Sequence, residues 1–277
     1  MSEFSSKSAH ATGSLPLSVV ISTFNRGDLL AGALESLTRQ TLDTRQFEVV
    51  IINDGSSDHT GEVVEGFSGK LPIRYIFQRN AGLASARNHG IFASRGDIVL
   101  FFDDDDIAHP SLLERHLEAH RKYPDLRMAV LGYTELGPEI ADKPLMQFVT
   151  ETGRFMFSYP LLRDGDIVDY TYFWGGRTSC KRIFLLQDGV FNPVFRFGCE
   201  DIELGYRLSK KGLGVVYNRK AISTMIRDID FDGFCQRLIR QGRSNYVFSR
   251  MHPDREIETW AETHDAEARW EKVSPSY

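Results

Sequence analysis

The chain has 277 residues and a formal net charge of -5 at pH 7, from 33 basic and 38 acidic side chains. A protein whose main partner is a nucleic acid usually carries a basic excess, so this composition argues against nucleic-acid binding. The three cysteines are too few and too far apart for a disulfide framework or a zinc site, which suits a reducing compartment.

Residues 1–15 are polar and rich in serine, and they lack the apolar core that a signal peptide requires. We expect them to form a flexible tail. The longest apolar runs, at 49–52 and 98–102, are far shorter than the roughly 20 residues that cross a bilayer. The sequence therefore predicts a cytoplasmic protein, and it leaves open whether that protein contacts a membrane surface.

Short runs of β-branched residues alternate with helical periodicity from Leu17 onward. The runs show no alternation of polar and apolar residues and are separated by helices, which indicates a parallel sheet covered on both faces. The sequence thus predicts an α/β fold with a doubly wound, mostly parallel sheet. The expected strands span 17–23, 47–53, 73–78 and 97–102, and a helix follows each of the first three.

The pattern changes after Pro110. Residues 137–178 have weak periodicity and many aromatic, glycine and proline residues, so loops and short strands are expected there. We expect one domain at 16–230, followed by a helical C-terminal segment at 231–277. The elements expected after Pro110 are a helix at 111–124, a strand at 128–136, a helix at 199–211, a short strand at 213–218 and helices from 231 to 270.

Polar groups stand directly after three of the expected strands. They are Ser22–Arg26, Asn53–Asp58 and Asp103–Asp106. Ligands of open α/β sheets bind beyond the carboxyl ends of the strands, so the three groups are expected to line one crevice.

Asp103 to Asp106 form the most unusual of these groups, because four adjacent carboxylates repel one another. A solvated acidic turn, or a cap for the helix near Pro110, would explain a generic run of this kind. Carboxylate oxygens are also the ligands that Mg²⁺ and Mn²⁺ prefer. Because residues two apart in an extended chain face the same way, Asp103 and Asp105 are expected to share one site while Asp104 points elsewhere. Asp106 is expected to act as a cap or a supporting group.

Five segments together resemble the family 2 glycosyltransferases. They are "SVVISTFNRGDLLAGALESLTRQT", "VVIINDGSSDHT", "NAGLASARNHGI", "VLFFDDDDIAHPSLLE" and "GCEDIELGYRL", and they come in the family's order between Ser18 and about Asn218. The resemblance implies a GT-A fold, with a nucleotide-sugar half at 16–108 and an acceptor half at 109–230. It also implies a metal-dependent, inverting transfer of a sugar from a nucleoside diphosphate sugar, UDP by default, to a hydroxyl group.

The same resemblance assigns the nucleotide contacts. Asp54 would accept a hydrogen bond from the ring N–H of uracil or thymine, although Asn53 stands where most relatives have aspartate. Ser22 and Phe24 would contact the base, in a loop that also holds Arg26. The alternatives are an ordinary turn at Asp54 and a simple loop capped by Asn25.

Gly82 and Arg87 belong to the next matching segment. Gly82 would let the backbone approach a ligand closely, and Arg87 would meet the base or the diphosphate. The plain alternative for Arg87 is a surface salt bridge.

The metal site follows from the family's DXD pattern. Asp105 would bind Mn²⁺ or Mg²⁺ together with Asp103, and Asp103 or Asp104 would meet the ribose. His252 is the candidate for a further ligand from the C-terminal segment, with His264 in reserve. The Arg-rich stretch that contains His252, "RLIRQGRSNYVFSRMHP", could instead cover the diphosphate as a lid.

A second pair of acids opens the helix expected near residue 200. The resemblance makes Asp201 the general base that takes the proton of the acceptor hydroxyl, and Glu200 the group that orients the acceptor. Acids in a first helical turn also complement the helix dipole, which is the structural alternative. The acceptor pocket would include Trp174, Gly176 and Arg177. Arg177 replaces the asparagine of many relatives and hints at an anionic acceptor or donor.

Two other functional classes would require different residues at these motifs. A catalytically inactive nucleotide-sugar-binding regulator would have lost Asp105 or Asp201, and both are present. A nucleotidyltransferase would normally have a Gly-rich phosphate loop after the first strand, and "STFNRGD" is not one. The donor sugar, the acceptor (a glycan, a lipid-linked or a small molecule) and the choice between monomer and homodimer stay open.

Overall fold

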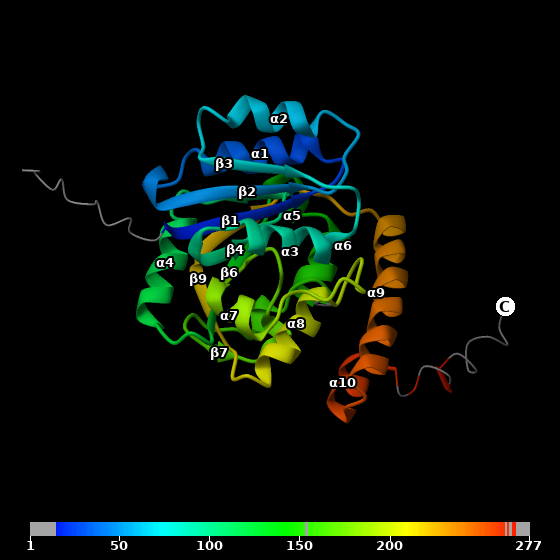
Figure 1. The fold of residues 1–277 in the computed structure, drawn as a ribbon. Helices are drawn as coiled ribbons and strands as arrows, with labels where there is room; N and C mark the ends of the chain where they lie inside the picture. Colours follow the sequence, from blue (N-terminus) through cyan, green and yellow to red (C-terminus); the bar gives the residue numbers. More distant parts are fainter. Residues whose placement is uncertain (1–14, 153–154, 264, 266–267, 270–277) are drawn as a thin grey trace, which may run out of the picture.

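The computed structural model describes residues 15–152, 155–263, 265 and 268–269 (Figure 1). All of the expected tail except Leu15, and also His264, therefore lie outside the described residues.

The first half of the chain forms the parallel part of the sheet. Strands β1 (Leu15–Thr23), β2 (Phe47–Asn53), β3 (Ile73–Phe77) and β4 (Gly96–Phe101) lie in the order β3-β2-β1-β4, and every neighbouring pair is parallel. The four strands match the predicted ones to within two residues at each end, and β2 has the predicted bounds. The prediction of a parallel sheet in this half is confirmed.

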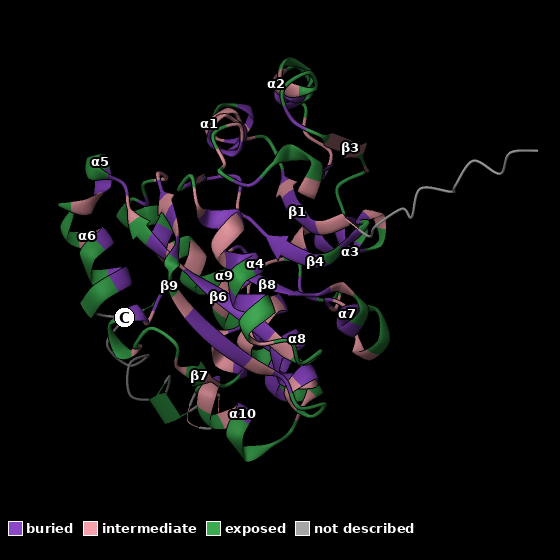
Figure 2. Ribbon diagram, turned by 90° about the vertical axis from the view of Figure 1, so that its left-hand side faces the viewer, coloured by how far each residue is buried: buried purple, intermediate pink, exposed green. Residues whose placement is uncertain are grey.

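Both faces of this sheet are buried. Val19 and Ile21 pack with Leu34 of α1 (Gly27–Leu37) on one face, whereas Val20 packs with Ile91 of α3 (Leu83–Ala93) on the other. Helix α2 (Thr60–Phe67) packs against α1. Burial of each aliphatic side chain contributes about 1.5–3 kcal/mol to the free energy of unfolding. The uninterrupted apolar runs therefore stabilise strands that are buried on both faces (Figure 2).

The second half extends the sheet with mixed directions. Strand β8 (Thr178–Lys181) is antiparallel to β4 and to β6 (Met128–Leu136), and β9 (Gly214–Met225) runs parallel to β6. Strand β5 (Asp106–Ala108) is antiparallel to the end of β9. Short β7 (Ile167–Val168) also pairs with β9. The complete order is β3-β2-β1-β4-β8-β6-β9-β5.

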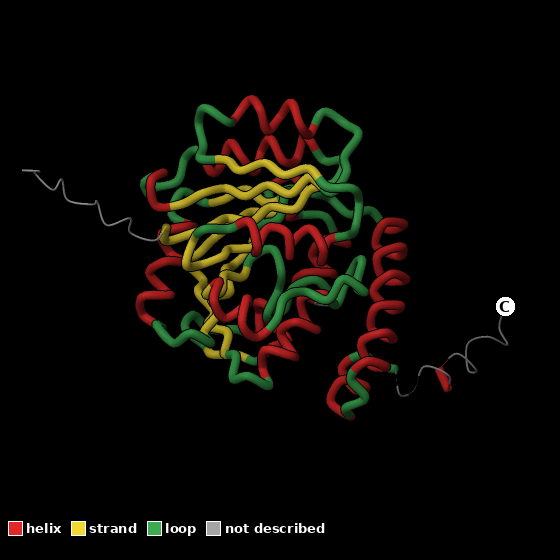
Figure 3. The backbone as a smooth tube through the Cα atoms, viewed as in Figure 1, coloured by secondary structure: helices red, strands yellow, loops and turns green. Residues whose placement is uncertain are grey.

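The structure differs from two of the expectations for this half. The expected strand at 213–218 is 12 residues long as β9, because its second part pairs with both β5 and the end of β6. The segment 137–178 has the expected loops and the short strand β7, but it also contains short helical turns that were not expected (Figure 3). These turns are α5 (Pro138–Ala141), α6 (Pro144–Gln147), a π turn at Phe148–Thr152 and 3-10 turns at Tyr159–Leu161 and Tyr170–Tyr172. A proline in the first two positions of α5, α6 and the turn at Tyr159–Leu161 supplies the fixed φ angle of an early helical residue.

Helices cover the second half and continue beyond it. They are α4 (Leu112–Lys122), α7 (Arg182–Asp188), α8 (Glu200–Ser209), α9 (Phe231–Met251) and α10 (Arg255–Trp260). Helix α9 stands along one side of the body, and only Phe234, Phe248 and Ser249 of its 21 residues are buried (Figure 1). Within the described part of the chain, no helix is both long and apolar enough to span a bilayer.

Candidate active site

A cleft of about 1180 Å³ opens at the carboxyl ends of β1, β2 and β4. All three polar groups predicted from the sequence contribute to it, so the expectation of one shared crevice is confirmed. The cleft does not include Gly176 or His252 among its lining residues. The predicted site residues that line it are Ser22, Phe24, Arg26, Asp54, Gly82, Arg87, Asp103, Asp104, Asp105, Trp174, Arg177, Glu200 and Asp201.

The loops after β1 and β2 are tied to each other. The side-chain oxygen of Asn25, a residue with a left-handed φ of 52°, accepts the Ser57 N–H at 2.8 Å. The Asn25 N–H in turn donates to the Ser56 hydroxyl at 2.8 Å. Asp58 accepts the Gly27 N–H at 3.0 Å, so Asp58 caps α1 and the reading of Asn25 as the cap is wrong. These bonds fix the wall that carries Ser22 and Phe24.

Asp54 is buried at the end of β2 and holds the next loop. Its Oδ1 accepts hydrogen bonds from Gln78 at 2.7 Å and from the Ala81 N–H at 2.8 Å, and its Oδ2 accepts the Gly82 N–H at 2.9 Å. A carboxylate oxygen can accept two hydrogen bonds, so Oδ2 has capacity for a ligand donor. Gly82 has a φ of 90°, which lets the chain turn into α3 here.

The run of aspartates forms a turn, not an extended strand. Asp104 and Asp105 both meet one guanidinium nitrogen of Arg26, at 2.8 and 3.4 Å. Arg227, from the loop after β9, also contacts Asp105 at 2.6 Å. The expectation of an extended chain with Asp104 pointing elsewhere was wrong, because the chain turns at Asp104 and Asp105 and both carboxylates meet Arg26. Asp103 and Asp105 both line the cleft, and their sharing of one metal site stays a prediction.

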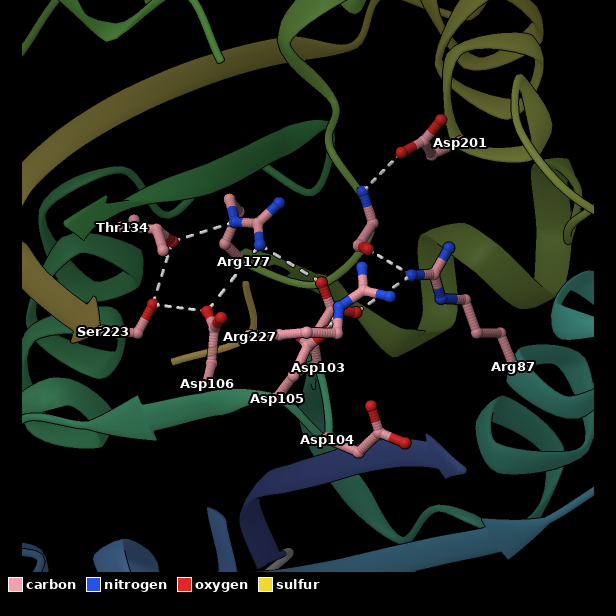
Figure 4. A network of polar contacts seen from close by, with 12 residues as sticks. Arg87, Asp103, Asp104, Asp105, Asp106, Thr134, Arg177, Asp201, Ser223 and Arg227 are labelled. Atoms are coloured by element: carbon pink, nitrogen blue, oxygen red, sulfur yellow. Dashed lines mark hydrogen bonds and ion pairs between the residues drawn. The ribbon is translucent and has the colours of Figure 1, made fainter. Parts of the chain in front are cut away.

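Asp103 and Asp106 share a different arginine, Arg177. Nη2 of Arg177 lies 3.2 Å from Asp103 and 3.7 Å from Asp106 (Figure 4). Nε of Arg177 donates to the Thr134 hydroxyl at 2.9 Å. Asp106 also accepts the Ser223 hydroxyl at 2.7 Å. The charge of Arg177 is thus balanced inside the protein, and this geometry gives no support to the hint of an anionic substrate at Arg177.

Asp106 is fully buried in β5, so it caps no helix and instead supports Arg177. Burial raises the pKa of the Asp106 carboxyl to about 7, although the nearby Arg177 lowers it, and repulsion from Asp105 and Asp103 adds to the rise. Similarly, burial raises the pKa of Asp104 to about 6 against the attraction of Arg26. The repulsion within the run is therefore relieved mainly by arginines from four distant segments: Arg26, Arg87, Arg177 and Arg227.

The aspartates of the cleft supply the oxygen ligands that Mn²⁺ and Mg²⁺ prefer. In the described residues no three histidine, cysteine or carboxylate side chains form a ready metal cluster. Mg²⁺, however, usually takes only one or two protein carboxylates and completes its shell with water and substrate phosphates. Asp103 and Asp105 both line the cleft and supply such oxygens, so the donor chemistry fits, provided that Arg227 leaves Asp105.

Arg87 joins the aspartate run to the second pair of acids. It is only 4 % exposed, so the reading as a surface salt bridge is wrong. Its Nη1 donates to Glu200 at 2.8 Å, and its Nη2 contacts Asp103 at 3.4 Å and donates to the Gly175 carbonyl. Burial raises the pKa of Glu200 to about 7, repulsion from Asp201 adds to the rise, and Arg87 opposes it.

Asp201 lies at the first turn of α8 with its carboxylate facing the cleft. Its Oδ2 accepts the Gly175 N–H at 2.9 Å, which fixes the side chain against the loop before β8 (Figure 4). Cys199 precedes α8 with a left-handed φ of 64°, and this turn presents both acids of the pair. A carboxylate oriented in this way at a cleft wall can accept a proton from a bound hydroxyl group.

The acceptor residues predicted from sequence occupy the same loop. Trp174 packs edge-on against Tyr159 with ring centroids 5.1 Å apart, and its Nε1 donates to the Thr171 carbonyl at 2.8 Å. Trp174 is therefore both a core aromatic and a cleft-lining residue. Gly176 has a φ of 149°, and a Cβ at this position would collide with the Asp103 carboxylate.

His252 lies against the far side of α8. Its Nε2 is 3.1 Å from Glu203, and its ring packs edge-on against Tyr206 and Phe248. The structure therefore does not bring it together with the other predicted site residues. The sequence reasoning also missed cleft residues, although the Arg-rich stretch of α9 was a signal for two of them. The missed side chains include Arg196, Phe197, Arg227, Arg237 and Arg240.

Comparisons with known proteins show the family of the chain. The family model for glycosyl transferase family 2 matches residues 18–181. Over 239 residues the chain is 33% identical to validoxylamine A glucosyltransferase of Streptomyces hygroscopicus subsp. jinggangensis, covering 76% of this chain and 56% of that protein. It is 27% identical over 223 residues to chondroitin synthase of Escherichia coli, covering 71% of this chain and 32% of that protein.

Solved structures show the fold. S. aureus TarS 1-349 in complex with UDP-GlcNAc superposes with a TM-score of 0.62 at 18% identity, over 78% of this chain and 59% of that one. The mannosyltransferase PcManGT from Pyrobaculum calidifontis gives a TM-score of 0.63 at 19% identity, over 88% and 66%. The fold is that of the GT-A glycosyltransferases. The chain belongs to glycosyl transferase family 2. It spans about half the length of the validoxylamine A glucosyltransferases that it matches.

Proposed function

We propose that this chain is an inverting glycosyltransferase that moves a sugar from a nucleoside diphosphate sugar to a hydroxyl group. The observation that carries the proposal is a single cleft lined by Asp54 from the end of β2, Asp103 and Asp105 from the turn after β4, and Asp201 from the start of α8. Family membership supports the reaction class. The separation of these carboxylates along the cleft suits a ligand with a base, a diphosphate and a sugar in line.

The donor is proposed to be a UDP-sugar, bound with its base beside Asp54. Oδ2 of Asp54 retains acceptor capacity for the ring N–H of uracil, and the ring of Phe24 is exposed in the same cleft. Relatives of the fold support the nucleotide only in general terms. TarS was solved with UDP-GlcNAc and GalNAc-T7 with UDP, whereas PcManGT was solved with GDP-Man.

Asp201 is proposed as the general base. Its contact with the Gly175 N–H orients the carboxylate, which takes the acceptor proton as the acceptor oxygen attacks the anomeric carbon. The bond from that carbon to the diphosphate breaks, and the diphosphate leaves with its electron pair. Arg87 holds Glu200 beside this base and keeps the two acidic motifs at a fixed spacing.

Asp103 and Asp105 would hold a divalent cation, which supplies positive charge beside the departing diphosphate. PcManGT and GalNAc-T7 were both solved with Mn²⁺, which supports a metal-dependent reaction of this kind. The arginines that now balance the aspartates are part of the same charge arrangement, because they can contact a diphosphate after releasing their carboxylates.

The experiment is a thermal-shift screen of UDP, GDP, dTDP and CDP with and without Mn²⁺, followed by a test for transfer from the corresponding sugar nucleotides. A ligand that binds only the native state raises the melting temperature. We expect UDP with Mn²⁺ to give the largest shift and Asp54→Ala to remove it. The proposal fails if no nucleotide shifts the parent protein and no sugar nucleotide is consumed.

A further inference from the structure

Helix α9 contributes a pair of arginines to the cleft. Arg237 and Arg240 both line it, and their guanidinium carbons lie 5.2 and 4.4 Å from the centre of the Phe197 ring. Phe197 itself stands in the segment that leads into α8 and Asp201. The three side chains therefore form one group beside the proposed general base, and nothing in the mechanism so far uses them.

Arg237 differs in its charge balance from the cleft arginines that contact the aspartate run and Glu200. Arg26, Arg87, Arg177 and Arg227 each have a carboxylate within 3.4 Å. Arg237 is half-buried, yet no carboxylate in the described part of the chain lies within ion-pair distance of it. Glu200, Asp201 and Asp103 act on Arg237 only from farther away.

The surroundings of Arg237 disfavour its charge. Burial and the neighbouring cation of Arg227 lower the pKa of Arg237. An arginine stays protonated even so, and its fork of N–H donors needs acceptors when it is withdrawn from water. Arg240 shares the Phe197 ring with Arg237, and in the described part of the chain no ion pair with a carboxylate is found for either of them. Two such cations close together beside a cleft are the arrangement that an anionic ligand relieves.

We propose that Arg237 and Arg240 form a binding site for an anionic group of a substrate held beside Asp201, a phosphate or a carboxylate. This inference rests on the proposed function, and it adds a specificity-determining site to it. The anion has two sources in such a reaction: the diphosphate of the donor, or a charged group on the acceptor. Arginine binds both phosphate and carboxylate through two parallel hydrogen bonds, so the chemistry of the site is the same for either source.

The test compares the parent with the double variant Arg237→Gln/Arg240→Gln. The matched control is Arg243→Gln, because Arg243 is exposed on the same helix and does not line the cleft. Each protein is titrated calorimetrically with uridine, with UDP, and with inorganic phosphate both alone and after saturation with UDP. Circular dichroism checks that α9 remains folded in each variant.

A donor site and an acceptor site give different results. If the arginines bind the donor diphosphate, the double variant loses about tenfold or more in UDP affinity and keeps its uridine affinity. If they bind an anion of the acceptor, UDP affinity is unchanged and the UDP-saturated variant binds phosphate at least about tenfold more weakly than the parent. The single variant Arg237→Lys should retain part of either affinity, because it keeps the charge and loses the fork.

The inference is overturned if the double variant binds UDP as tightly as Arg243→Gln does and also binds phosphate as tightly, both in the free protein and after saturation with UDP. That result leaves the proposed function intact. If instead the parent binds neither uridine nor UDP, the proposed function fails, and the phosphate titration of the free protein still decides whether the arginines form an anion site.

Discussion

Arg87 of α3 and Glu200 of α8 form a buried ion pair, with 2.8 Å between Nη1 and Oε1, although 113 residues separate them in the sequence. The pair links the parallel half of the sheet to the helix that carries Asp201. Because Arg87 also contacts Asp103 and the Gly175 carbonyl, one guanidinium connects both acidic motifs and the loop between them.

The variant Arg87→Met is expected to lose about 3–5 kcal/mol of unfolding free energy at pH 8, because it removes the cation that pairs with the buried Glu200 carboxylate, which must then stay unpaired or take up a proton. The double variant Arg87→Met/Glu200→Met should recover most of that loss. Urea unfolding of the parent, both single variants and the double variant measures the four free energies. A double variant no more stable than Arg87→Met would contradict the importance of this pair.

The same series has a pH dependence with a definite sign. Burial raises the pKa of Glu200 to about 7, above its ordinary value, so the folded state binds this proton more tightly than the unfolded state does. Stability from this group is present at low pH and is lost as the pH rises toward 7. The loss of unfolding free energy in Arg87→Met should therefore be smaller at pH 5 than at pH 8, since Glu200 is neutral at pH 5.

Asp105→Asn tests the proposed metal site. The substitution keeps the shape of the side chain but removes the anionic oxygen that Mn²⁺ would bind. We expect the Mn²⁺-dependent part of the UDP thermal shift to disappear, while any metal-independent part, which depends on Asp54, persists. Asp142→Asn is the control, because Asp142 is exposed and does not line the cleft. An unchanged Mn²⁺-dependent shift in Asp105→Asn would remove Asp105 from the metal site.

Asp201→Asn separates binding from chemistry. The asparagine carbonyl can still accept the Gly175 N–H, so the loop geometry and the affinity for UDP should be kept. Loss of the general base should lower kcat by roughly 100- to 10,000-fold. Calorimetry with UDP and a rate assay of sugar transfer give the two quantities. If kcat falls less than about tenfold, another group is the base, and Glu200 would be the next to test.

The sequence predicted those features that depend on local pattern. Strand β2 has its predicted bounds because all of its residues are buried and five of the seven are apolar, and the crevice follows from where parallel strands end. The partners of the aspartate run could not be read in this way. Arg26, Arg87, Arg177 and Arg227 come from four separate segments, and only the folded chain brings them to the carboxylates. The turn at Asp104 follows from those long-range contacts, so the extended-chain expectation failed there.

A pair of buried histidines on α4 should make the protein sensitive to acid. His116 Nδ1 and His120 Nε2 lie 2.8 and 2.9 Å from the Ser179 hydroxyl. The other ring nitrogen of each histidine is buried without a hydrogen-bond partner among the residues that the structure describes. Burial lowers the pKa of His116 to about 3 and lowers that of His120 well below its ordinary value.

The sign of the acid effect follows from these lowered pKa values. Between about pH 6.5 and pH 3 the unfolded chain binds the proton of His116 and the folded chain does not, so stability is lost as the pH falls through this range. Each such histidine contributes a slope of about 1.4 kcal/mol per pH unit. His116→Asn should therefore lower the slope of unfolding free energy against pH by about one proton, whatever its effect on absolute stability.

Urea unfolding at several values between pH 4.5 and pH 6 measures that slope. The control is His89→Asn, since His89 is exposed on α3 and has no contact with the buried pair. The control should keep the slope of the parent. If His116→Asn also keeps the slope of the parent, His116 binds its proton equally in the folded and unfolded chain. That result would contradict its burial and would mean that water reaches the ring.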